Sequence, residues 1–498
     1  MNLASIIESH PGDATALISR GQATDYATLR EQVGALRGGF TGLGLQTGDR
    51  VAILAGNNWY FVVSYLAAVG AGLVAVPMNP TNPQAAIEHE LRQIGARAAV
   101  VGPTAREACD CIDRTAVPSL EFVIGAGFEP DGSGGLHLDD LLGTAPSPVV
   151  DRDPSDPAVL IFTSGTAGAP RAAVLSHGSL FANIRQVLAS AEGLQGPDDV
   201  ALGILPMFHI FGLNVMLGVS LAVGAAVVLV ERFDPVSAIE TVELHKVTTI
   251  SGPPTMWAAW AGLPGVGPEA FATVRRAVSG AAKLPTEVAT AIEAKYGLHL
   301  EEGYGLTEAA PVVCSPSGTD APAGSVGIPL PGIELRIVDA DGSDVLVGDA
   351  GELWVRGPNV FSGYWEDPEA TARVITPDGW LRTGDVAVVD DAGFLFIVDR
   401  AKDLVIVSGF NVYPAEVEEV VNAHPAVEAC AVVGVPHPYT GEAVKAYVVV
   451  REGSSIEEDD VIAFCAERLA RYKCPNKVWF VEELPRGLGG KILRRVLR

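Results

Sequence analysis

The sequence is poor in basic residues and in cysteine. It contains 34 Lys and Arg against 60 Asp and Glu, which gives a formal net charge of −26. So acidic a chain repels phosphate backbones, which excludes sequence-independent binding of nucleic acid. The six cysteines include no Cys-x-x-Cys pair, which argues against a zinc site or a disulfide framework and favours reduced thiols.

Unbroken hydrophobic spans are also missing. Two stretches, Val51 to Ile87 and Val200 to Val230, contain no Asp, Glu, Lys or Arg, and about 20 apolar residues would cross a bilayer. Asn, Pro and Gly interrupt both stretches, and neither has basic flanking loops. We therefore predict no transmembrane segment and interpret each stretch as a helix with buried strands of a parallel sheet. No secretory signal is visible at the start, so we expect a cytoplasmic protein.

Charge divides the chain into two parts. The first 399 residues carry a net charge of −25, whereas residues 400–498 contain 13 Lys and Arg against 14 Asp and Glu. Within that tail, the last 31 residues hold nine basic residues and only two acidic ones. This basic end suits an anionic ligand, although a solvated helix surface is the alternative.

Residue patterns predict an α/β fold. Strand-like and helical segments alternate in the front part, which indicates doubly wound parallel sheets covered by helices. Short strands separated by Asp-Gly turns from Gly324 to Asp391 predict a small antiparallel unit. A helix from Pro414 followed by two strands predicts a small α+β C-terminal domain. The Pro- and Gly-rich stretch from Gly125 to Pro148 is expected to be a loop or short linker.

A loop suited to phosphate follows the apolar strand at residues 158–162. It comprises hydroxyl and glycine residues followed by one cation: Thr163, Ser164, Gly165, Thr166, Gly168 and Arg171. Backbone N–H groups in such a turn form a concave anion site, to which hydroxyls and a guanidinium add donors. The spacing is not that of the usual P-loop, so that mechanism does not follow, and an ordinary Ser/Gly loop is the alternative.

Further motifs follow along the chain. They are Pro206-Met207-Phe208-His209, Gly303-Tyr304-Gly305-Leu306-Thr307-Glu308, Gly351-Glu352-Leu353, Gly379 to Asp385, Asp399 to Asp403, and Gly490-Lys491. Together with the phosphate loop, and in this order, they resemble the adenylate-forming superfamily over essentially the whole chain. The residues of these motifs are most similar to those of bacterial fatty-acyl-CoA synthetases.

The resemblance implies a reaction and its cofactors. Such enzymes join a carboxylic acid to AMP from ATP with Mg²⁺, release diphosphate, and pass the acyl group to coenzyme A. It implies that Lys491, Glu308 and Thr307 are catalytic, with Glu308 holding the metal. The loop above, Glu302 to Thr307, Asp385, Arg400 and Lys491 would bind ATP. A lysine near both reacting anions would neutralise them in the transition state.

The resemblance also assigns the acyl and thiol sites. His209, Gly280, Ala281 and Gly305 would line the acid, and Gly409 would border the CoA channel. Domains of 1–399 and 400–498 would meet at a hinge near Lys402, about which the small C-terminal domain moves. Lids that rebuild a site between two steps have precedent.

The substrate remains the most open point. The uncharged block after His209 offers no charged partner for an amino group or a second carboxylate, so an apolar acid fits best, with a medium- or long-chain fatty acid preferred. An aryl-CoA ligase of the 4-coumarate type, an acyl-AMP ligase loading a carrier protein, and a non-catalytic acyl-binding relative stay open. Arg171, Ala172 and Lys283 depart from the family pattern. Peripheral membrane contact is compatible with a fatty substrate, and both a monomer and a homodimer stay open.

Overall fold

The computed structural model describes residues 1–128, 135–163, 170–400, 403–407, 410–438, 440–486 and 492–497, with backbone alone at residues 400, 410, 411, 441 and 495. The chain folds as two compact units. The first comprises Met1–Ala323, Gly327–Glu334 and Val355–Leu381, and the second comprises Gly324–Val326, Leu335–Trp354 and Arg382–Arg498. The domain boundary at residue 400 stays a prediction, and Lys402 lies outside the described residues.

Two large, mostly parallel sheets form the first unit, which confirms the predicted α/β class. One has the order β14 (Leu300–Glu302), β13 (Arg276–Ser279), β12 (Thr249–Gly252), β10 (Val200–Gly203), β11 (Ala226–Leu229), β1 (Thr15–Ser19) and β2 (Gln22–Asp25). The other has the order β20 (Gly363–Tyr364), β9 (Arg171–Ser176), β8 (Pro157–Thr163), β4 (Val74–Pro77), β3 (Arg50–Leu54), β5 (Ala98–Val101), β6 (Phe122–Gly125) and β7 (Leu136–His137). A small sheet of β15 (Tyr304–Gly305), β16 (Val312–Ser315) and β17 (Ile328–Pro329) completes this unit.

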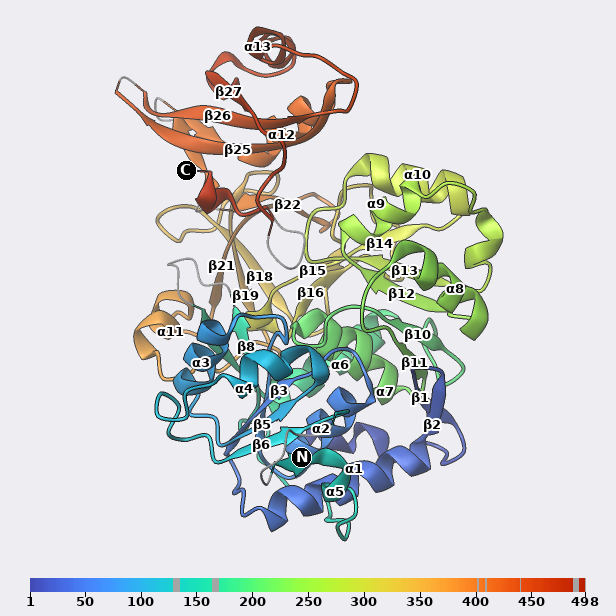
Figure 1. The fold of residues 1–498 in the computed structure, drawn as a ribbon. Coiled ribbons are helices and arrows are strands. Elements are labelled where there is room, and N and C mark those ends of the chain that lie inside the picture. The colour runs from blue at the N-terminus through green and yellow to red at the C-terminus, as the bar shows by residue number, and fades with distance from the viewer. Residues whose placement is uncertain are drawn as a thin grey trace. The chain divides into compact units, whose positions relative to one another are not determined.

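Helices cover these sheets (Figure 1). They are α1 (Tyr26–Gly42), α2 (Trp59–Gly70), α3 (Gln84–Gln93), α4 (Arg106–Asp110), α5 (Leu138–Leu141), α6 (His177–Ser190), α7 (Ser220–Ala222), α8 (Pro235–His245), α9 (Pro254–Gly262), α10 (Thr286–Tyr296) and α11 (Pro368–Val374). Trp257 and Trp260 of α9 are fully buried in one core with Ile250 of β12. A second core surrounds β3 and β4. Short 3-10 helices add η1 (Leu3–Ile7), η2 (Pro103–Ala105), η4 (Pro268–Phe271) and η5 (Thr307–Ala309).

Both uncharged stretches form buried structure, as predicted. The first contains β3, α2 and β4, and the second contains β10, the π-helix η3 (Phe211–Val219), α7 and β11. Strand β3 is fully buried from Val51 to Leu54, because helices cover both faces of a parallel sheet. Across the described residues, no helix combines the length and the apolar character needed to cross a membrane.

The interpretation of Gly125 to Pro148 as a loop or linker is wrong in part. That stretch contains β7, which pairs with β6, and the short helix α5. Leu138 of α5 is fully buried. Short apolar segments of this kind are hidden among Gly and Pro because too few residues show a period.

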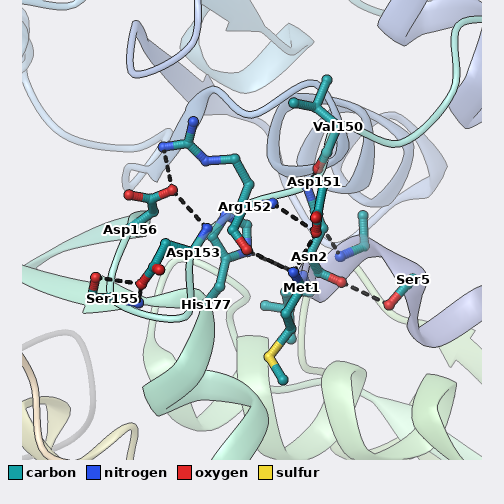
Figure 2. Close-up of polar contacts among 12 residues, drawn as sticks. Met1, Asn2, Ser5, Val150, Asp151, Arg152, Asp153, Ser155, Asp156 and His177 are labelled. Atoms are coloured by element: carbon teal, nitrogen blue, oxygen red, sulfur yellow. Dashed lines mark hydrogen bonds and ion pairs between the residues drawn. The ribbon is translucent and has the colours of Figure 1, made fainter.

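The start of the chain packs against two distant segments (Figure 2). The Asn2 side chain donates to the carbonyl oxygen of Val150 at 2.8 Å, and the N–H of Leu3 donates to Nδ1 of His177 at 3.1 Å. Burial lowers the pKa of His177 to about 4, so the ring is neutral at pH 7 and Nδ1 can accept this bond. A neutral histidine thus ties η1 to the start of α6.

The second unit contains two further sheets. One has the order β18 (Glu334–Val338), β19 (Gly351–Arg356), β21 (Leu381–Val389) and β22 (Leu395–Arg400), as expected for the small antiparallel unit. The other contains β24 (Phe410–Val412), β23 (Val405–Val407), β26 (Gly441–Val450) and β25 (Val427–His437), with β27 (Lys477–Phe480) paired to β26. Helices α12 (Pro414–Asn422) and α13 (Glu458–Ala466) and the turns η7 (Arg471–Lys473) and η8 (Arg494–Val496) complete the predicted α+β tail.

Candidate active site

The predicted phosphate loop joins two paired strands. Strands β8 and β9 are antiparallel, with Thr163 opposite Arg171, so the two ends of the loop are held together. Ser164, Gly165, Thr166 and Gly168 lie outside the described residues. Their role in binding ATP therefore stays a prediction, as does that of Thr163.

Arg171 is engaged by neighbours in the first unit. Its Nε donates to Oδ2 of Asp367 at 3.1 Å, and its guanidinium lies 5.9 Å from the ring centroid of Tyr364. Asp367 also caps α11, accepting from the N–H of Ala370 at 2.8 Å. These two donors lower the pKa of Asp367, with the backbone bond the larger cause. An incoming phosphate would share Arg171 with this carboxylate.

Three parallel strands end beside the small-residue segment. In register, Gly252 of β12 lies opposite Ser279 of β13, which lies opposite Glu302 of β14. The N–H of Gly280 donates to the carbonyl of Gly252 at 3.2 Å. Ligands of α/β folds bind at the carboxyl ends of parallel strands. The predicted site residues Gly280, Ala281 and Glu302 therefore lie at an edge of the sheet where a ligand is expected.

Ala281 has an unusual backbone conformation. Its φ of +69° lies in the left-handed region, which costs a non-glycine residue about 1–2 kcal/mol. Residues held in such conformations cluster at functional sites. The conformation of Ala281 is therefore consistent with its predicted place beside the ligand.

Glu302 holds the segment that follows Ala281. Its Oε1 accepts from the N–H of Leu284 at 2.9 Å, and burial raises its pKa to about 7. Lys283, one of the departures from the family pattern, lowers that pKa in opposition. The described contact of Glu302 is thus structural, and its role in ATP binding stays a prediction.

The Gly303–Glu308 motif is packed against the segment that follows it. The N–H of Leu306 donates to the carbonyl of Pro311 at 3.0 Å. A Cβ added at Gly305 would fall on that same carbonyl oxygen, so the close approach of two backbones requires glycine here. Tyr304 and Gly305 of this motif form β15, and Thr307 and Glu308 lie in the turn η5.

Glu308 has a donor that sequence reasoning missed. The hydroxyl of Tyr364 donates to Oε1 of Glu308 at 2.7 Å. Among the described residues, no group of three His, Cys, Asp or Glu side chains could hold a metal. A single oriented carboxylate nevertheless fits Mg²⁺, which is usually held by one or two carboxylates and the substrate phosphates.

Three buried asparagines fix the backbone after Glu308. Asn359 donates to Ala309 O at 2.7 Å, Asn214 to Ala310 O at 2.7 Å, and Asn183 to Val312 O at 2.8 Å. All three side chains are buried. Sequence reasoning did not single them out, because each reaches a partner at least 50 residues away.

His209 lies between β10 and the π-helix η3. Its ring packs against Phe208 with centroids 4.7 Å apart. Its Nε2 is buried and has no hydrogen-bond partner among the described residues, and burial lowers its pKa. A neutral ring in apolar surroundings is compatible with the predicted role of His209 in positioning a substrate, and that role stays a prediction.

The wall beyond His209 comes close to the small-residue segment. A Cβ added at Gly280 would lie 3.1 Å from the ring of Phe211. The π-helix that begins at Phe211 is a rare element, found frequently at functional sites. The uncharged residues Phe211 and Gly280 thus lie close together in the first unit.

The two predicted ribose residues are neighbours in the second unit. Asp385 of β21 lies directly opposite Arg400 of β22, and Asp385 is buried. The Arg400 side chain is outside the described part of the structure, as are Lys402, Gly409 and Lys491 entirely. The register brings Asp385 and Arg400 together, while the roles of all five residues stay predictions.

Comparison with known proteins gives matches over the whole chain. The family description "AMP-binding enzyme" matches residues 4–365, and "AMP-binding enzyme C-terminal domain" matches residues 416–491. A feruloyl-CoA synthase of an Amycolatopsis species is 38% identical, with 97% of this chain and 95% of the relative covered. A long-chain-fatty-acid–CoA ligase of Yersinia pestis is 35% identical, with 98% and 91% covered. The crystal structure of ATP-bound MatB from Rhodopseudomonas palustris has a TM-score of 0.92 at 34% identity, with 100% of this chain and 98% of that chain covered.

Proposed function

Because the chain belongs to the AMP-binding enzyme family, and so to the adenylate-forming acyl- and aryl-CoA ligases, we propose that it activates an apolar monocarboxylic acid. ATP, Mg²⁺ and CoA are the cofactors of such ligases, as the sequence predicted. The first substrate candidate is a medium- or long-chain fatty acid. The observation that carries this choice is the apolar surrounding of His209: its buried Nε2 has no hydrogen-bond partner among the described residues, and burial lowers the pKa of the ring.

An aryl acid is the second candidate. The named feruloyl-CoA synthase is 38% identical, and the ring of Phe211 stands over Gly280, which favours a thin or flat group. The acid panel described below separates the two candidates.

The proposed first step joins the acid to AMP. A carboxylate oxygen forms a bond to the α-phosphorus of ATP, and the bond from that phosphorus to the bridging oxygen breaks, so diphosphate leaves. Lys491 would neutralise both anions, Tyr304 would stack on adenine, and Thr307 would donate to a phosphate. Mg²⁺, held by Glu308 with the phosphates, would offset their charge.

The proposed second step transfers the acyl group. The thiol sulfur of CoA attacks the acyl carbon, AMP departs, and the thiol proton passes to solvent. Gly409 would leave room for the pantetheine arm, because a Cβ there would obstruct a thin ligand. Asp385 and Arg400 would hold the ribose hydroxyls through both steps.

A panel of aliphatic and aromatic acids, scored by AMP release with and without CoA, tests this proposal. Rapid acylation of free CoA would exclude a ligase that serves only a carrier protein. No ATP-dependent AMP release with any acid would overturn the proposal in favour of a non-catalytic acyl-binding protein.

Lys491→Ala tests the catalytic assignment. We expect diphosphate exchange to be abolished, while acyl-AMP supplied with CoA is still converted to thioester. Lys477→Ala, which removes an exposed lysine paired with Glu458, is the matched control and should exchange normally. Normal exchange by Lys491→Ala would remove Lys491 from the mechanism.

A further inference from the structure

Glu308 lies in a short turn that ends in an unusual backbone conformation. The turn η5 spans Thr307–Ala309, and the next residue, Ala310, has a φ of +65° in the left-handed region, which is unfavourable for a residue with a Cβ. Ala309 and Ala310 are fully buried, so water cannot satisfy their carbonyl groups. Partners within the protein must therefore hold this turn.

Two buried asparagines supply those partners. The Nδ2 of Asn359 donates to the carbonyl oxygen of Ala309 at 2.7 Å, and the Nδ2 of Asn214 donates to that of Ala310 at 2.7 Å. Asn214 belongs to the π-helix η3, and its amide also donates to the carbonyl oxygen of Leu180 in α6 at 3.1 Å. Two consecutive carbonyls of the turn are thus fixed by side chains from two separate segments.

The same two side chains leave their oxygens unpaired. Oδ1 of Asn214 and Oδ1 of Asn359 are buried and have no hydrogen-bond partner in the part of the chain that the structure describes. Asn183, which holds the carbonyl of Val312 farther along, differs because its Oδ1 accepts from the N–H of Val312 at 3.1 Å. A buried acceptor without a partner lowers stability, and proteins accept such local costs mainly at functional sites. The unpaired oxygens therefore indicate that these two amides are retained for the shape of the turn.

The other side of Glu308 is held by residues 359–364. The N–H of Phe361 donates to the carbonyl oxygen of Glu308 at 2.9 Å, and the hydroxyl of Tyr364 donates to its Oε1 at 2.7 Å. Tyr364 belongs to β20, which pairs with β9. One short segment thus provides a donor to the carboxylate of Glu308, a donor to its carbonyl and, through Asn359, a donor to the carbonyl that follows.

We propose that Asn214 and Asn359 are positioning residues for Mg²⁺-dependent ATP binding: by holding the turn after Glu308, they fix the direction in which its carboxylate is presented to the metal. The inference rests on the role of Glu308 in the proposed function. Every contact that carries it lies within the first unit. Mg²⁺ demands near-octahedral ligands at about 2.0–2.1 Å, so a small rotation of this turn would weaken metal binding.

Asn214→Leu and Asn359→Leu test the proposal in the full-length protein, because leucine keeps the branched shape of the side chain but donates no hydrogen bond. For each, we expect the Mg²⁺ concentration that supports half-maximal ATP binding to rise about tenfold, since the partners that orient a metal ligand are worth about 10- to 100-fold in metal affinity. ATP binding in EDTA, without Mg²⁺, should change less than about threefold. Calorimetry in the absence of the carboxylic acid substrate measures both quantities.

Calorimetry also separates positioning from unfolding. Loss of folded protein lowers the number of ATP molecules bound per chain, whereas loss of positioning changes the Mg²⁺ requirement of the folded molecules. Where a leucine variant is not recovered folded, Asn214→Ser or Asn359→Ser, which keeps one hydroxyl donor, decides by the same criterion. A normal Mg²⁺ requirement at either position would remove that residue from the proposal, and a normal requirement at both would overturn it.

Asn2→Leu is the matched control. Asn2 is a buried asparagine of the same unit, and its Nδ2 also donates to two backbone carbonyls, those of Val69 at 2.9 Å and Val150 at 2.8 Å (Figure 2). Asn2→Leu should lower stability and leave the Mg²⁺ requirement unchanged. A rise equal to that of the variants beside Glu308 would show a general effect of losing a buried amide and would overturn the proposal.

Double variants show whether the asparagines act through Glu308. Residues that act as one unit lose function non-additively, so Asn214→Leu should not raise the Mg²⁺ requirement further in the Glu308→Gln background. A further rise of about tenfold there would contradict positioning. If Glu308→Gln alone has a normal Mg²⁺ requirement, the metal role of Glu308 and the positioning role fail together; if it raises that requirement and the asparagine variants do not, only the positioning role fails. AMP release in the acid panel tests the proposed reaction independently of this titration.

Discussion

The two units differ in the kinds of contact that dominate around their candidate functional residues. The first relies mainly on backbone approach and neutral side chains, although Arg171 pairs with Asp367: Gly305 lies against Pro311, three asparagines hold the segment after Glu308, and His209 is uncharged. The second uses ion pairs, with Arg494 bound to Glu418 and Lys473 to Glu416. A site built on backbone tolerates little change of shape, whereas one built on charge tolerates little change of chemistry.

Gly305→Ala should have the largest effect on activity, because the added Cβ would clash with backbone atoms of the first unit. The added Cβ would lie within 2.8 Å of the carbonyl carbon of Pro311 and 3.1 Å of Cα of Val312. Neither atom can move as a flexible side chain would, so we expect at least about a 100-fold loss in diphosphate exchange.

Gly262→Ala in α9 is the matched control, since nothing lies within 4 Å of its added Cβ. It should retain activity and gain slightly in stability, because alanine favours helices. Equal exchange rates for Gly305→Ala and Gly262→Ala would show that the close approach is unimportant.

Acid should lower the stability of the first unit by protonating His177, which is buried and neutral at pH 7 in the folded protein. Its pKa is about 4 in the folded chain, below the ordinary value of 6.5. The unfolded chain therefore binds the proton first, and stability present above pH 6.5 is lost as pH falls toward 4. The shift corresponds to a loss of about 3 kcal/mol in the free energy of unfolding.

Denaturant unfolding at pH 7.5 and pH 4.5 measures this loss. His177→Asn is the reference, because its amide oxygen can accept the Leu3 N–H but does not titrate. The difference in pH dependence between the two proteins isolates the histidine from the carboxylates. Parallel pH profiles would show that His177 does not couple protonation to folding.

Tyr364→Phe should have an intermediate effect, because the Tyr364 hydroxyl donates to Glu308, the proposed Mg²⁺ ligand. The 2.7 Å bond to Glu308 is lost, and hydrogen bonds to charged groups contribute about 1.5–3 kcal/mol. We expect the Mg²⁺ concentration needed to support ATP binding to rise about tenfold. Calorimetry in the absence of the carboxylic acid substrate measures this change.

Tyr26→Phe provides the control, because it removes a buried hydroxyl that donates to the neutral carbonyl of Ala225 at 2.9 Å. It should lower stability and leave the Mg²⁺ dependence unchanged. An unaltered Mg²⁺ titration for Tyr364→Phe would separate Tyr364 from the proposed metal site.

Ala281→Gly should have the smallest effect and sharpens the account of backbone strain. Relief of the left-handed conformation should raise the free energy of unfolding by up to about 1 kcal/mol. Ala282→Gly, next to it but without a positive φ, should instead lower stability by about 0.5–1 kcal/mol. Thermal unfolding of the two variants shows whether each is more or less stable than the unaltered protein. A change in the same direction for both would contradict strain at Ala281.

Local patterns were sufficient for the sheets and for much of the first unit. The uncharged stretch from Val51 correctly predicted buried β3 and β4, because burial on both faces leaves its mark in consecutive residues. Gly305 was singled out only through the motif that resembles the adenylate-forming superfamily, and the structure adds a physical reason for glycine there, the close approach of the Pro311 carbonyl.

Long-range partners could not be predicted in the same way. Tyr364 and Glu308 are 56 residues apart, and no period links them. The basic tail was read by its net charge, yet Arg494, Lys473 and Lys477 each pair with a carboxylate that is distant in sequence. The π-helix at Phe211 was missed because its apolar residues show no distinctive spacing.

Because of the π-helix η3, the number of residues between β10 and β11 affects where the side chains of this segment point. A π-helix pairs residues i and i+5, so removing one residue restores the i+4 pairing of an α-helix. Every side chain beyond the deletion would then turn by about 100°, while β10 and β11 on either side keep their places in the sheet. Deletion of a single residue here would therefore rearrange the wall beyond Phe211 while leaving the surrounding sheet in place.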